Sequence, residues 1–191
     1  LLFSLLGGGD DAAGPGATGT TTAVAPVSPG ETDGESGSPE PTGAITIVDV
    51  TDFDPETDGG NNEEYPEDTA NVTDGDPATT WSTDAHFQPF PALKNGVGLM
   101  MTLPAPTKIA EVSIDSPTPG THVEIRTAPA PDAGLTQTQV VGASELRGDV
   151  TDIPVQMDGA TRNVLVWITS LSTEGGQNQS SIGEIRFKAA E

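Results

Sequence analysis

Residues 70–83, with the sequence ANVTDGDPATTWST, hold the densest group of possible metal ligands in the chain. Asp74 and Asp76 flank Gly75, and the hydroxyl of Thr79 follows shortly after them. Calcium prefers about six to eight oxygen ligands, and a turn of this kind supplies carboxylates, carbonyls and a hydroxyl. The same residues also suit a metal-free turn in which Asp74 and Thr79 bind nearby backbone groups. Both interpretations stay open at this point.

A second acidic stretch, DPETDGGNNEEY at residues 54–65, has some of the acids of an EF-hand calcium loop at Asp54, Glu56 and Asp58. Its last position, where such a loop needs a bidentate glutamate, is Tyr65. No helical pattern flanks the stretch. We therefore expect a solvated acidic loop here rather than a metal site.

The chain offers little for catalysis. His86 and His122 are its only histidines, and it has no nucleophile elbow, zinc-hydrolase helix motif or phosphate-binding loop. Acid pairs occur throughout so acidic a sequence, so no single pair indicates a glycosidase couple. We expect a protein that is not an enzyme.

Charge and cysteine content exclude further classes. Seven basic residues against 29 acidic ones give a formal net charge of −22. Binding to nucleic acid or to anionic lipid headgroups needs clustered Lys and Arg, so we expect neither partner. The absence of cysteine excludes disulfides and thiolate metal sites.

Composition divides the chain into three parts. Residues 1–6, LLFSLL, are apolar but shorter than the roughly 20 residues of a membrane span, and we interpret them as the end of a transmembrane helix. A fusion remnant or part of a signal peptide is the alternative. Residues 7–43 are rich in Gly, Pro, Thr and Ser and predict a disordered, flexible linker before a folded domain at residues 44–191. No basic residue precedes Lys94, which favours the extracytoplasmic side of the cell membrane.

The folded domain has the pattern of short strands separated by Pro, Gly, Asn and Asp clusters, and only residues 65–72 suggest a helical turn. Eight such strands predict an all-β fold, an antiparallel β-sandwich or jelly roll. The expected strands are residues 44–53, 96–103, 108–116, 122–128, 138–144, 150–156, 162–171 and 181–189.

Alternation within residues 162–171 predicts which side chains face the core. Val164, Val166 and Ile168 share one face of this strand, because successive strand side chains point to opposite sides. We expect this β-branched set to point inward. Trp167 then lies on the outer face, either exposed or covered by a loop.

Five motifs follow one another along the folded domain: DGDPATTWST, the paired strands GVGLMMTLPAPTKIAEVSIDS, then HVEIRTA, RNVLVWI and SIGEIRF. Their order resembles discoidin or coagulation-factor type C domains, and carbohydrate-binding modules with the galactose-binding-like jelly roll. The resemblance covers residues 44–190. It implies a galactose-binding-domain-like sandwich with Trp81 in its core.

A narrower resemblance rests on three longer segments, VTDFDPETDGGNNEEYPEDTANVTDGDPATTWST, FPALKNGVGL and SPTPGTHVEIRTA. They resemble the extracytoplasmic C-terminal domain of actinobacterial MviN/MurJ proteins, which are related to the flippase for lipid-linked peptidoglycan precursors. The resemblance implies a domain tethered to the membrane by a preceding helix. Its partners would be cell-wall glycan (peptidoglycan or its precursor), or membrane and cell-wall synthesis proteins if the domain is a scaffold with no sugar site.

The resemblance also implies site residues. In relatives that bind calcium, this loop and an acid of the last strand hold the ion, so one structural Ca2+ is expected. The ligands carried over are Asn71, Asp74, Asp76, Thr79 and Glu184. Sugar recognition in this fold uses loops at one end of the sandwich, where an aromatic ring stacks on the sugar. The expected ligand-binding residues are Tyr65, His86, Phe87, Phe90 and Asn95. For Phe87 and Phe90, the alternative is that they anchor their own loop in the core.

Overall fold

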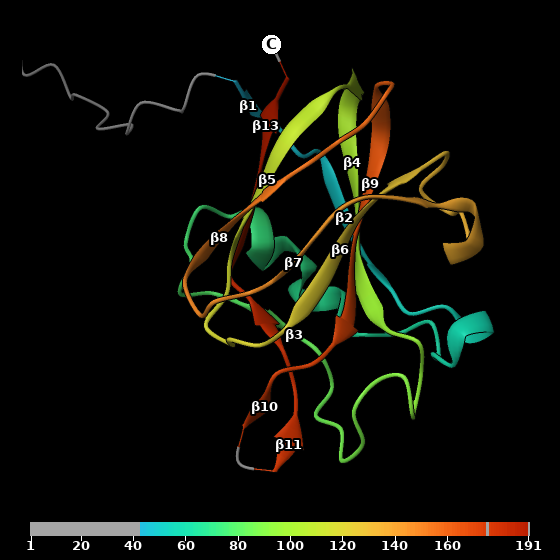
Figure 1. Cartoon of the computed structure of the whole chain (residues 1–191), viewed down its shortest axis with the longest axis vertical. Coiled ribbons are helices and arrows are strands. Elements are labelled where there is room, and N and C mark those ends of the chain that lie inside the picture. Colours follow the sequence, from blue (N-terminus) through green and yellow to red (C-terminus); the bar gives the residue numbers. More distant parts are fainter. Residues whose placement is uncertain (1–42, 175, 191) are drawn as a thin grey trace, which may run out of the picture. The chain divides into compact units, whose positions relative to one another are not determined.

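The structure, a computed structural model, describes residues 43–174 and 176–190 (Figure 1). The membrane-helix remnant expected at residues 1–6 and nearly all of the linker expected at 7–43 lie outside the described residues. Within the described ranges, no helix combines the length and hydropathy needed to cross a membrane.

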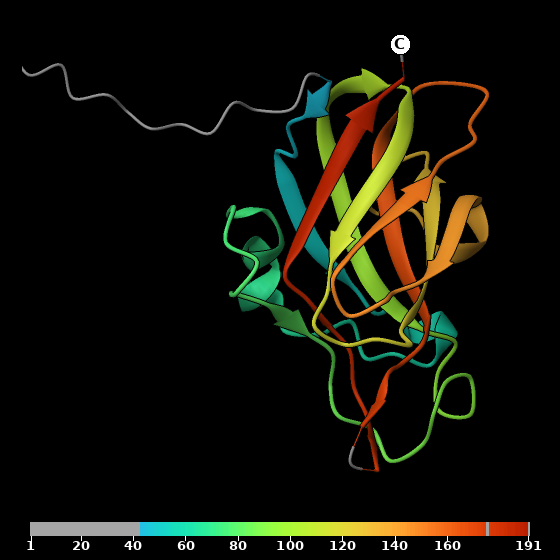
Figure 2. The same ribbon diagram turned by 60° about the vertical axis from the view of Figure 1, so that its left-hand side comes forward.

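The described part of the chain is built around two antiparallel sheets that lie face to face (Figure 2). The larger sheet has the strand order β2-β4-β9-β6-β7 and the smaller has the order β1-β13-β5-β8. The larger sheet contains β2 (Asp49–Phe53), β4 (Val97–Thr107), β9 (Thr161–Ser170), β6 (His122–Ala128) and β7 (Gln139–Glu145). The smaller contains β1 (Ala44–Ile45), β13 (Glu184–Ala189), β5 (Ile109–Asp115) and β8 (Val150–Pro154). The predicted all-β antiparallel sandwich is confirmed.

Short elements connect the strands. The helical turn expected at residues 65–72 is the 3-10 helix η2 (Pro66–Thr73). The other short elements are the 3-10 helices η1 (Glu56–Asp58) and η3 (Leu135–Gln137), the pair β3 (Trp81–Ser82) with β12 (Ser181–Ile182), and the pair β10 (Thr173–Glu174) with β11 (Gln177–Asn178).

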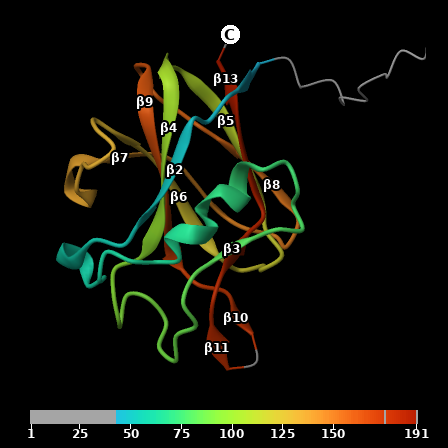
Figure 3. The same ribbon diagram turned by 180° about the vertical axis from the view of Figure 1, so that it is seen from behind.

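Two of the expected strands each divide between different sheets. Residues 44–53 form β1, which pairs with β13, and β2, which pairs with β4. Residues 181–189 form β12, which pairs with β3, and β13, which pairs with β5. Residues 44–53 therefore contribute to both main sheets, and residues 181–189 contribute to the small β12–β3 sheet and to one main sheet. Figure 3 shows β1 and β2 following one another along the edge of the sandwich.

The main core lies between the two sheets. Val164, Val166 and Ile168 of β9 are fully buried there, as their alternation predicts. Trp81 is also fully buried in this cluster, in agreement with its expected place. The opposite sheet contributes, among others, Val112, Ile114, Ile153, Ile185 and Phe187.

A smaller cluster covers the outer face of the larger sheet. Trp167 is only 2% exposed there, packed with Met100 and Leu165 and covered by residues from neighbouring loops, among them Leu135. The ring of Phe53 meets Trp167 edge to face, with the ring centres 5.7 Å apart. Of the two alternatives for Trp167, the structure therefore shows the covered one.

Candidate functional site

The loop of residues 84–95 connects β3 to β4 at one end of the sandwich, beside β10 and β11 (Figure 1). This segment, the 84–95 loop, is fixed near its start by backbone hydrogen bonds. The amide of His86 donates to the carbonyl of Asn178 at 2.9 Å, and the amide of Asn178 donates back to His86 at the same distance. The loop therefore continues the β10–β11 pair as an irregular third strand.

Phe90 fixes the middle of the 84–95 loop and contacts Lys94 near its far end. Phe90 is 6% exposed and belongs to the main core, so its ring face is not open to a ligand. The ammonium of Lys94 lies 5.9 Å from the centre of the Phe90 ring, within the range of a cation–π contact. Of the expected ligand-binding residues, Phe90 is thus a loop anchor.

Lys94 is the cation of a buried ion cluster. Its Nζ donates to Asp54 Oδ1 at 2.9 Å and to Glu64 Oε2 at 2.7 Å, and all three side chains are nearly inaccessible. Burial alone would lower the pKa of Lys94, but the hydrogen bonds to Glu64 and Asp54 together raise it. The solvated acidic loop expected at residues 54–65 is therefore wrong for Asp54 and Glu64, because a lysine distant in sequence compensates their charges.

The remaining oxygens of these two carboxylates hold backbone from separate segments. Asp54 Oδ2 accepts the amide of Asn61 at 2.8 Å. Glu64 Oε1 accepts the amide of Asp84 at 2.6 Å. Every carboxylate oxygen in the cluster thus has a partner, which buried charges require. The cluster joins the 54–64 segment to both ends of the 84–95 loop.

Asn95 closes the loop at its far end. Its backbone amide donates to the carbonyl of Asp58 at 2.9 Å, and its side-chain amide donates to Asp58 Oδ1 at 3.1 Å. The predicted ligand-binding residue Asn95 therefore uses its side chain to bind η1.

Between these anchors the loop presents apolar side chains to solvent. Phe87 is 86% exposed and Leu93 is 49% exposed. The neighbouring His86 has its Nε2 buried, with no hydrogen-bond partner among the described residues. Tyr65 is 41% exposed, and a hydrogen bond and the negative charge of Asp84 raise the pKa of its phenol. The structure thus groups His86, Phe87 and Phe90 on one loop, with Tyr65 beside Asp84 at its start.

The predicted calcium loop is closed by its own hydrogen bonds in this structure. Asp74 Oδ1 accepts the amide of Asp76 at 2.8 Å, and Asp74 Oδ2 accepts the hydroxyl of Thr79 at 2.7 Å. These two bonds lower the pKa of Asp74 because they favour its charged form. The side-chain amide of Asn71 donates to the carbonyl of Thr80 at 2.9 Å, which ties η2 to the end of the loop.

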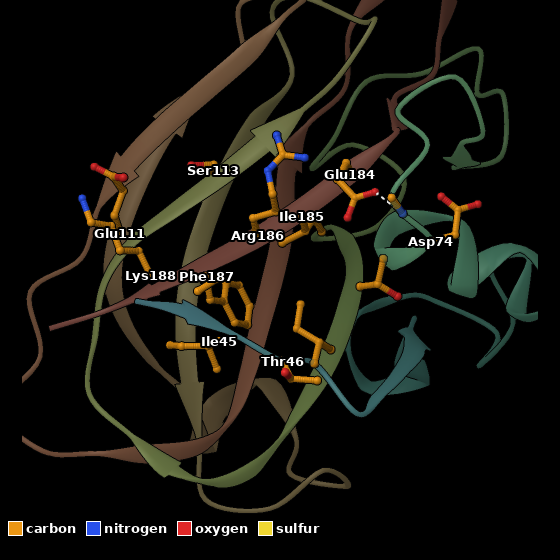
Figure 4. A pocket seen from close by; sticks show the side chains of 14 residues that line it. Ile45, Thr46, Asp74, Glu111, Ser113, Glu184, Ile185, Arg186, Phe187 and Lys188 are labelled. Carbon is orange, nitrogen blue, oxygen red and sulfur yellow. Dashed lines mark hydrogen bonds between the residues drawn. The ribbon is translucent and has the colours of Figure 1, made fainter. Parts of the chain in front are cut away.

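Glu184, at the start of β13, contacts this loop although the two are far apart in the sequence. Its Oε2 accepts the amide of Gly75 at 2.9 Å (Figure 4). The contact depends on Gly183, where an added Cβ would lie 2.5 Å from the carbonyl oxygen of Pro77. Glu184 is 5% exposed, and burial is the main reason that its pKa is raised.

The five expected calcium ligands are therefore close together, and their donor set suits a hard cation. Asp74 contributes to raising the pKa of Glu184, so the two carboxylates already repel one another. Two carboxylates with nearby carbonyl oxygens are a favourable ligand set for a divalent cation. Within residues 43–174 and 176–190, no group of three or more His, Cys, Asp and Glu side chains could hold a metal, so a site here would depend on backbone carbonyls.

The fold and the loop end define the class of structure: an antiparallel sandwich of the discoidin or galactose-binding-like type, as in the CBM32 carbohydrate-binding modules. The chain is similar to the structure of Clostridium perfringens ZmpB that contains two CBM32 modules and an M60 catalytic domain, with a TM-score of 0.56 and 17% identity. It is also similar to the CBM32 of AlyQ in complex with 4,5-unsaturated mannuronic acid (TM-score 0.53, 14% identity) and to a pectin-binding carbohydrate-binding module (TM-score 0.50, 18% identity).

The extent of these similarities differs. They cover 76%, 77% and 77% of this chain, and 14%, 98% and 94% of the ZmpB, AlyQ and pectin-binding structures respectively. A second ZmpB structure, containing the two CBM32 modules, is matched over 37% of its length. No protein-family model matches the chain. Identities this low establish the fold, and none of these structures is an MviN/MurJ protein, so that narrower assignment stays a prediction.

Proposed function

We propose that residues 44–191 are a non-catalytic carbohydrate-binding module that binds glycan through the 84–95 loop. The observation that carries the proposal is Phe87, whose side chain is 86% exposed on a loop fixed on both sides. A ring held this far into solvent can stack on a ligand without first leaving the core. The apolar face of a sugar ring can form this stack, and an aromatic side chain provides the matching flat surface.

The anchors of the loop support this use. The His86–Asn178 hydrogen bonds lie on one side of Phe87, and the buried Phe90 with its Lys94 contact lies on the other. A backbone fixed in this way loses little entropy on binding, so more of the contact energy remains as affinity. Exposed Gln88, beside Phe87, supplies an amide that can donate to and accept from sugar hydroxyls.

The chain's charge limits the choice of glycan. Its net charge of −22 opposes strongly anionic polymers, which would be repelled unless a cation bridges them. The CBM32 of AlyQ is in complex with an acidic sugar, 4,5-unsaturated mannuronic acid, and the other module binds pectin, an acidic polymer. For this chain we favour a glycan with little charge at the contact. Cell-wall peptidoglycan or its lipid-linked precursor, contacted through its sugar backbone, is the glycan that we propose.

The proposed setting is the extracytoplasmic side of the cell membrane. It is supported by the sequence alone: the apolar residues 1–6, the linker at 7–43 and the absence of basic residues before Lys94. In this arrangement the module is tethered beside the place of cell-wall synthesis, as part of an MviN/MurJ-like protein. The linker would allow the module to search the adjacent wall.

We also propose one structural calcium ion beside β13. The carboxylates of Asp74 and Glu184, with the carbonyls of Asn71, Asp76 and Thr79, would hold it. The ion would neutralise the repulsion between the two carboxylates and join the loop after η2 to the last strand. Its role would be stability of the fold rather than contact with the glycan.

The alternative function is a protein-interaction or scaffold domain of the cell-wall machinery. Leu93 is exposed on the same loop as Phe87. Two exposed apolar side chains suit a protein partner as well as a sugar, which favours this alternative. The two functions differ in what the loop binds, so one experiment separates them.

The experiment is sedimentation of the full chain with isolated cell-wall sacculi, together with titration of a panel of muropeptides, in calcium and then in chelator. We expect binding that Phe87→Ala weakens by about tenfold or more, a loss of about 1.4 kcal/mol. Val140→Ala is the matched control, because Val140 is a 44% exposed apolar side chain on β7. No binding in either condition, with capture of a cell-wall synthesis protein through Phe87, would establish the alternative instead.

A further inference from the structure

A groove of about 640 Å³ lies along β13, and its lining includes residues from both faces of that strand (Figure 4). Its walls are β13, part of β5, the segment at residues 44–47 and the turn at residues 73–75. Its volume falls within the roughly 300–1,000 Å³ of small-molecule sites in proteins. None of its lining residues belongs to the 84–95 loop, so it is a separate surface.

Strand register decides which side chains face this groove. Ile185 and Phe187 point into the core, so Glu184, Arg186 and Lys188 point outward from the same strand. On β5, Ser113 lies opposite Arg186 and Glu111 lies opposite Lys188. The outward side chains of β13 are thus an acid followed by two bases, and their partners on β5 are Asp115, Ser113 and Glu111.

The cations of the groove are not used by the fold. Among the ion pairs formed within residues 43–174 and 176–190, none includes Arg186 or Lys188. The hydroxyl of Ser113, directly opposite Arg186, donates to Asp152 Oδ1 at 2.6 Å, which leaves its oxygen as an acceptor. Arg186 and Lys188 therefore offer hydrogen-bond donors to whatever occupies the groove.

Glu184 supplies an acceptor from a buried position. Glu184 is only 5% exposed, yet it lines the groove. Its Oε2 accepts the amide of Gly75, and its other oxygen has no hydrogen bond among the described residues. That oxygen is accessible, because His86 Nε2 is the one buried side-chain polar atom without a partner among the described residues. It can therefore accept a hydrogen bond from a ligand in the groove.

The mixture of groups selects the class of ligand. An anion would meet the carboxylates of Asp74, Glu111 and Glu184, and a cation would meet Arg186 and Lys188. A purely apolar ligand would remove all of these charges from water without compensation. A sugar hydroxyl both donates and accepts, so neighbouring hydroxyls can satisfy interleaved donors and acceptors at once. Half-buried Ile45 and Ile47 offer an apolar wall for the carbon face of the ring.

We infer that this groove is a second glycan-binding site, for an uncharged sugar with neighbouring hydroxyls. Arg186 and Lys188 donate to the sugar oxygens, and Glu111 accepts from its hydroxyls. Glu184 accepts from them when it holds no ion, so the sugar and the proposed calcium compete for this carboxylate. The site is independent of the 84–95 loop, so either can exist without the other. Two sites on one module would raise its apparent affinity for a polymer that reaches both.

The test is a titration of the full chain followed by the backbone amide signals of its NMR spectrum. The probes are three neutral trisaccharides, of N-acetylglucosamine, galactose and glucose, and as an anionic comparison the trisaccharide of galacturonic acid. We expect a neutral sugar to shift the amides of β13 and β5. Arg186→Gln should weaken this binding by about tenfold or more, whereas Phe87→Ala and the charge control Lys108→Gln should leave it unchanged.

Each other outcome overturns one proposal or both. Shifts confined to residues 84–95 would overturn the groove and support the loop. Shifts confined to β13 and β5 would support glycan binding in the groove and overturn glycan binding by the 84–95 loop. Tighter binding of the galacturonic acid trimer at β13, or unchanged binding in Arg186→Gln, would overturn the assignment of the groove to neutral sugars. No shift with any probe would overturn both sites.

Discussion

The ammonium of Lys94 lies 2.7 Å from the carboxylate of Glu64, and both side chains are almost completely buried. Glu64 also accepts the amide of Asp84, and its backbone carbonyl accepts the indole N–H of Trp81 at 2.8 Å. Glu64 thus connects the lysine of the 84–95 loop to Trp81 in the main core. The geometry of the proposed binding loop is therefore coupled to the stability of the domain.

Replacing Lys94 by alanine should be strongly destabilising, because it leaves the buried Asp54 and Glu64 carboxylates without their cation. We expect a loss of about 3–5 kcal/mol in the free energy of unfolding. Chemical denaturation measures it, and Lys108→Ala, an exposed lysine, is the control, with a change within about 0.5 kcal/mol. Equal stability of the two variants would show that the cluster does not hold the loops.

The two phenylalanines of the 84–95 loop should separate stability from binding. Phe90→Ala removes a buried ring and should cost about 3–5 kcal/mol of unfolding free energy. Phe87→Ala removes an exposed ring and should change stability by less than about 0.5 kcal/mol. Comparing the two denaturation curves tests this assignment, which a large loss of stability in Phe87→Ala would contradict.

Tyr65 is the chain's single tyrosine, so its ionisation can be followed alone by ultraviolet absorbance. Asp84 accepts a hydrogen bond from the neutral phenol and repels the phenolate, so the pKa lies above the ordinary value of 10.0. The absorbance midpoint should accordingly lie above 10.0, with circular dichroism confirming that the fold persists. Asp84→Asn should lower the midpoint. An unchanged midpoint would show that Asp84 does not affect the ionisation of Tyr65.

Calcium should raise the melting temperature if the proposed ion is bound, because a ligand that binds only the folded chain stabilises it. Asp74→Ala should abolish the calcium response, whereas Asp132→Ala, at an exposed acid outside the site, should keep it. The pKa of Asp74 is lowered in the folded chain, so its charge contributes stability above its unfolded value of 3.8. This contribution is lost as the pH falls through the lower, folded pKa. Identical melting temperatures of the wild-type chain in calcium and in chelator would overturn the proposed calcium site.

Gly183→Ala should destabilise the domain by about 1–3 kcal/mol, because its Cβ would press on the carbonyl of Pro77. The turn carrying Gly75 would then move away from Glu184. Gly159→Ala is the control, since an added Cβ there meets nothing within 4 Å. Equal melting temperatures for the two variants would mean that the loop adapts without strain.

Much of the fold could be predicted, because its signals are local. The alternation of Val164, Val166 and Ile168 reports one buried face. Six of the eight expected strands recur within a few residues of their predicted bounds, and the other two each divide into two shorter strands. β10 and β11 were missed because two-residue strands leave no periodic pattern. β11 is held instead by the hydrogen bonds between Asn178 and His86, a pair far apart in sequence.

The site was harder to predict, because its main constraints join residues far apart in sequence. Asp54 and Glu64 lie in a stretch so acidic that composition favours solvent exposure. Only Lys94, the first basic residue of the chain, indicated that a compensating charge was available. Phe87 and Phe90 have similar neighbours, so sequence alone could not decide which one lies in the core.

The domain begins and ends at the same edge, since Ala44 pairs with Lys188 across β1 and β13. The 84–95 loop and the β10–β11 pair lie at the other end of the sandwich (Figures 1 and 3). The first and last strands of the sandwich therefore meet at the end remote from the 84–95 loop. A bulky, cross-linked polymer can approach the loop head-on, whereas a ligand for the groove beside β1 must pass close to the first strand of the domain.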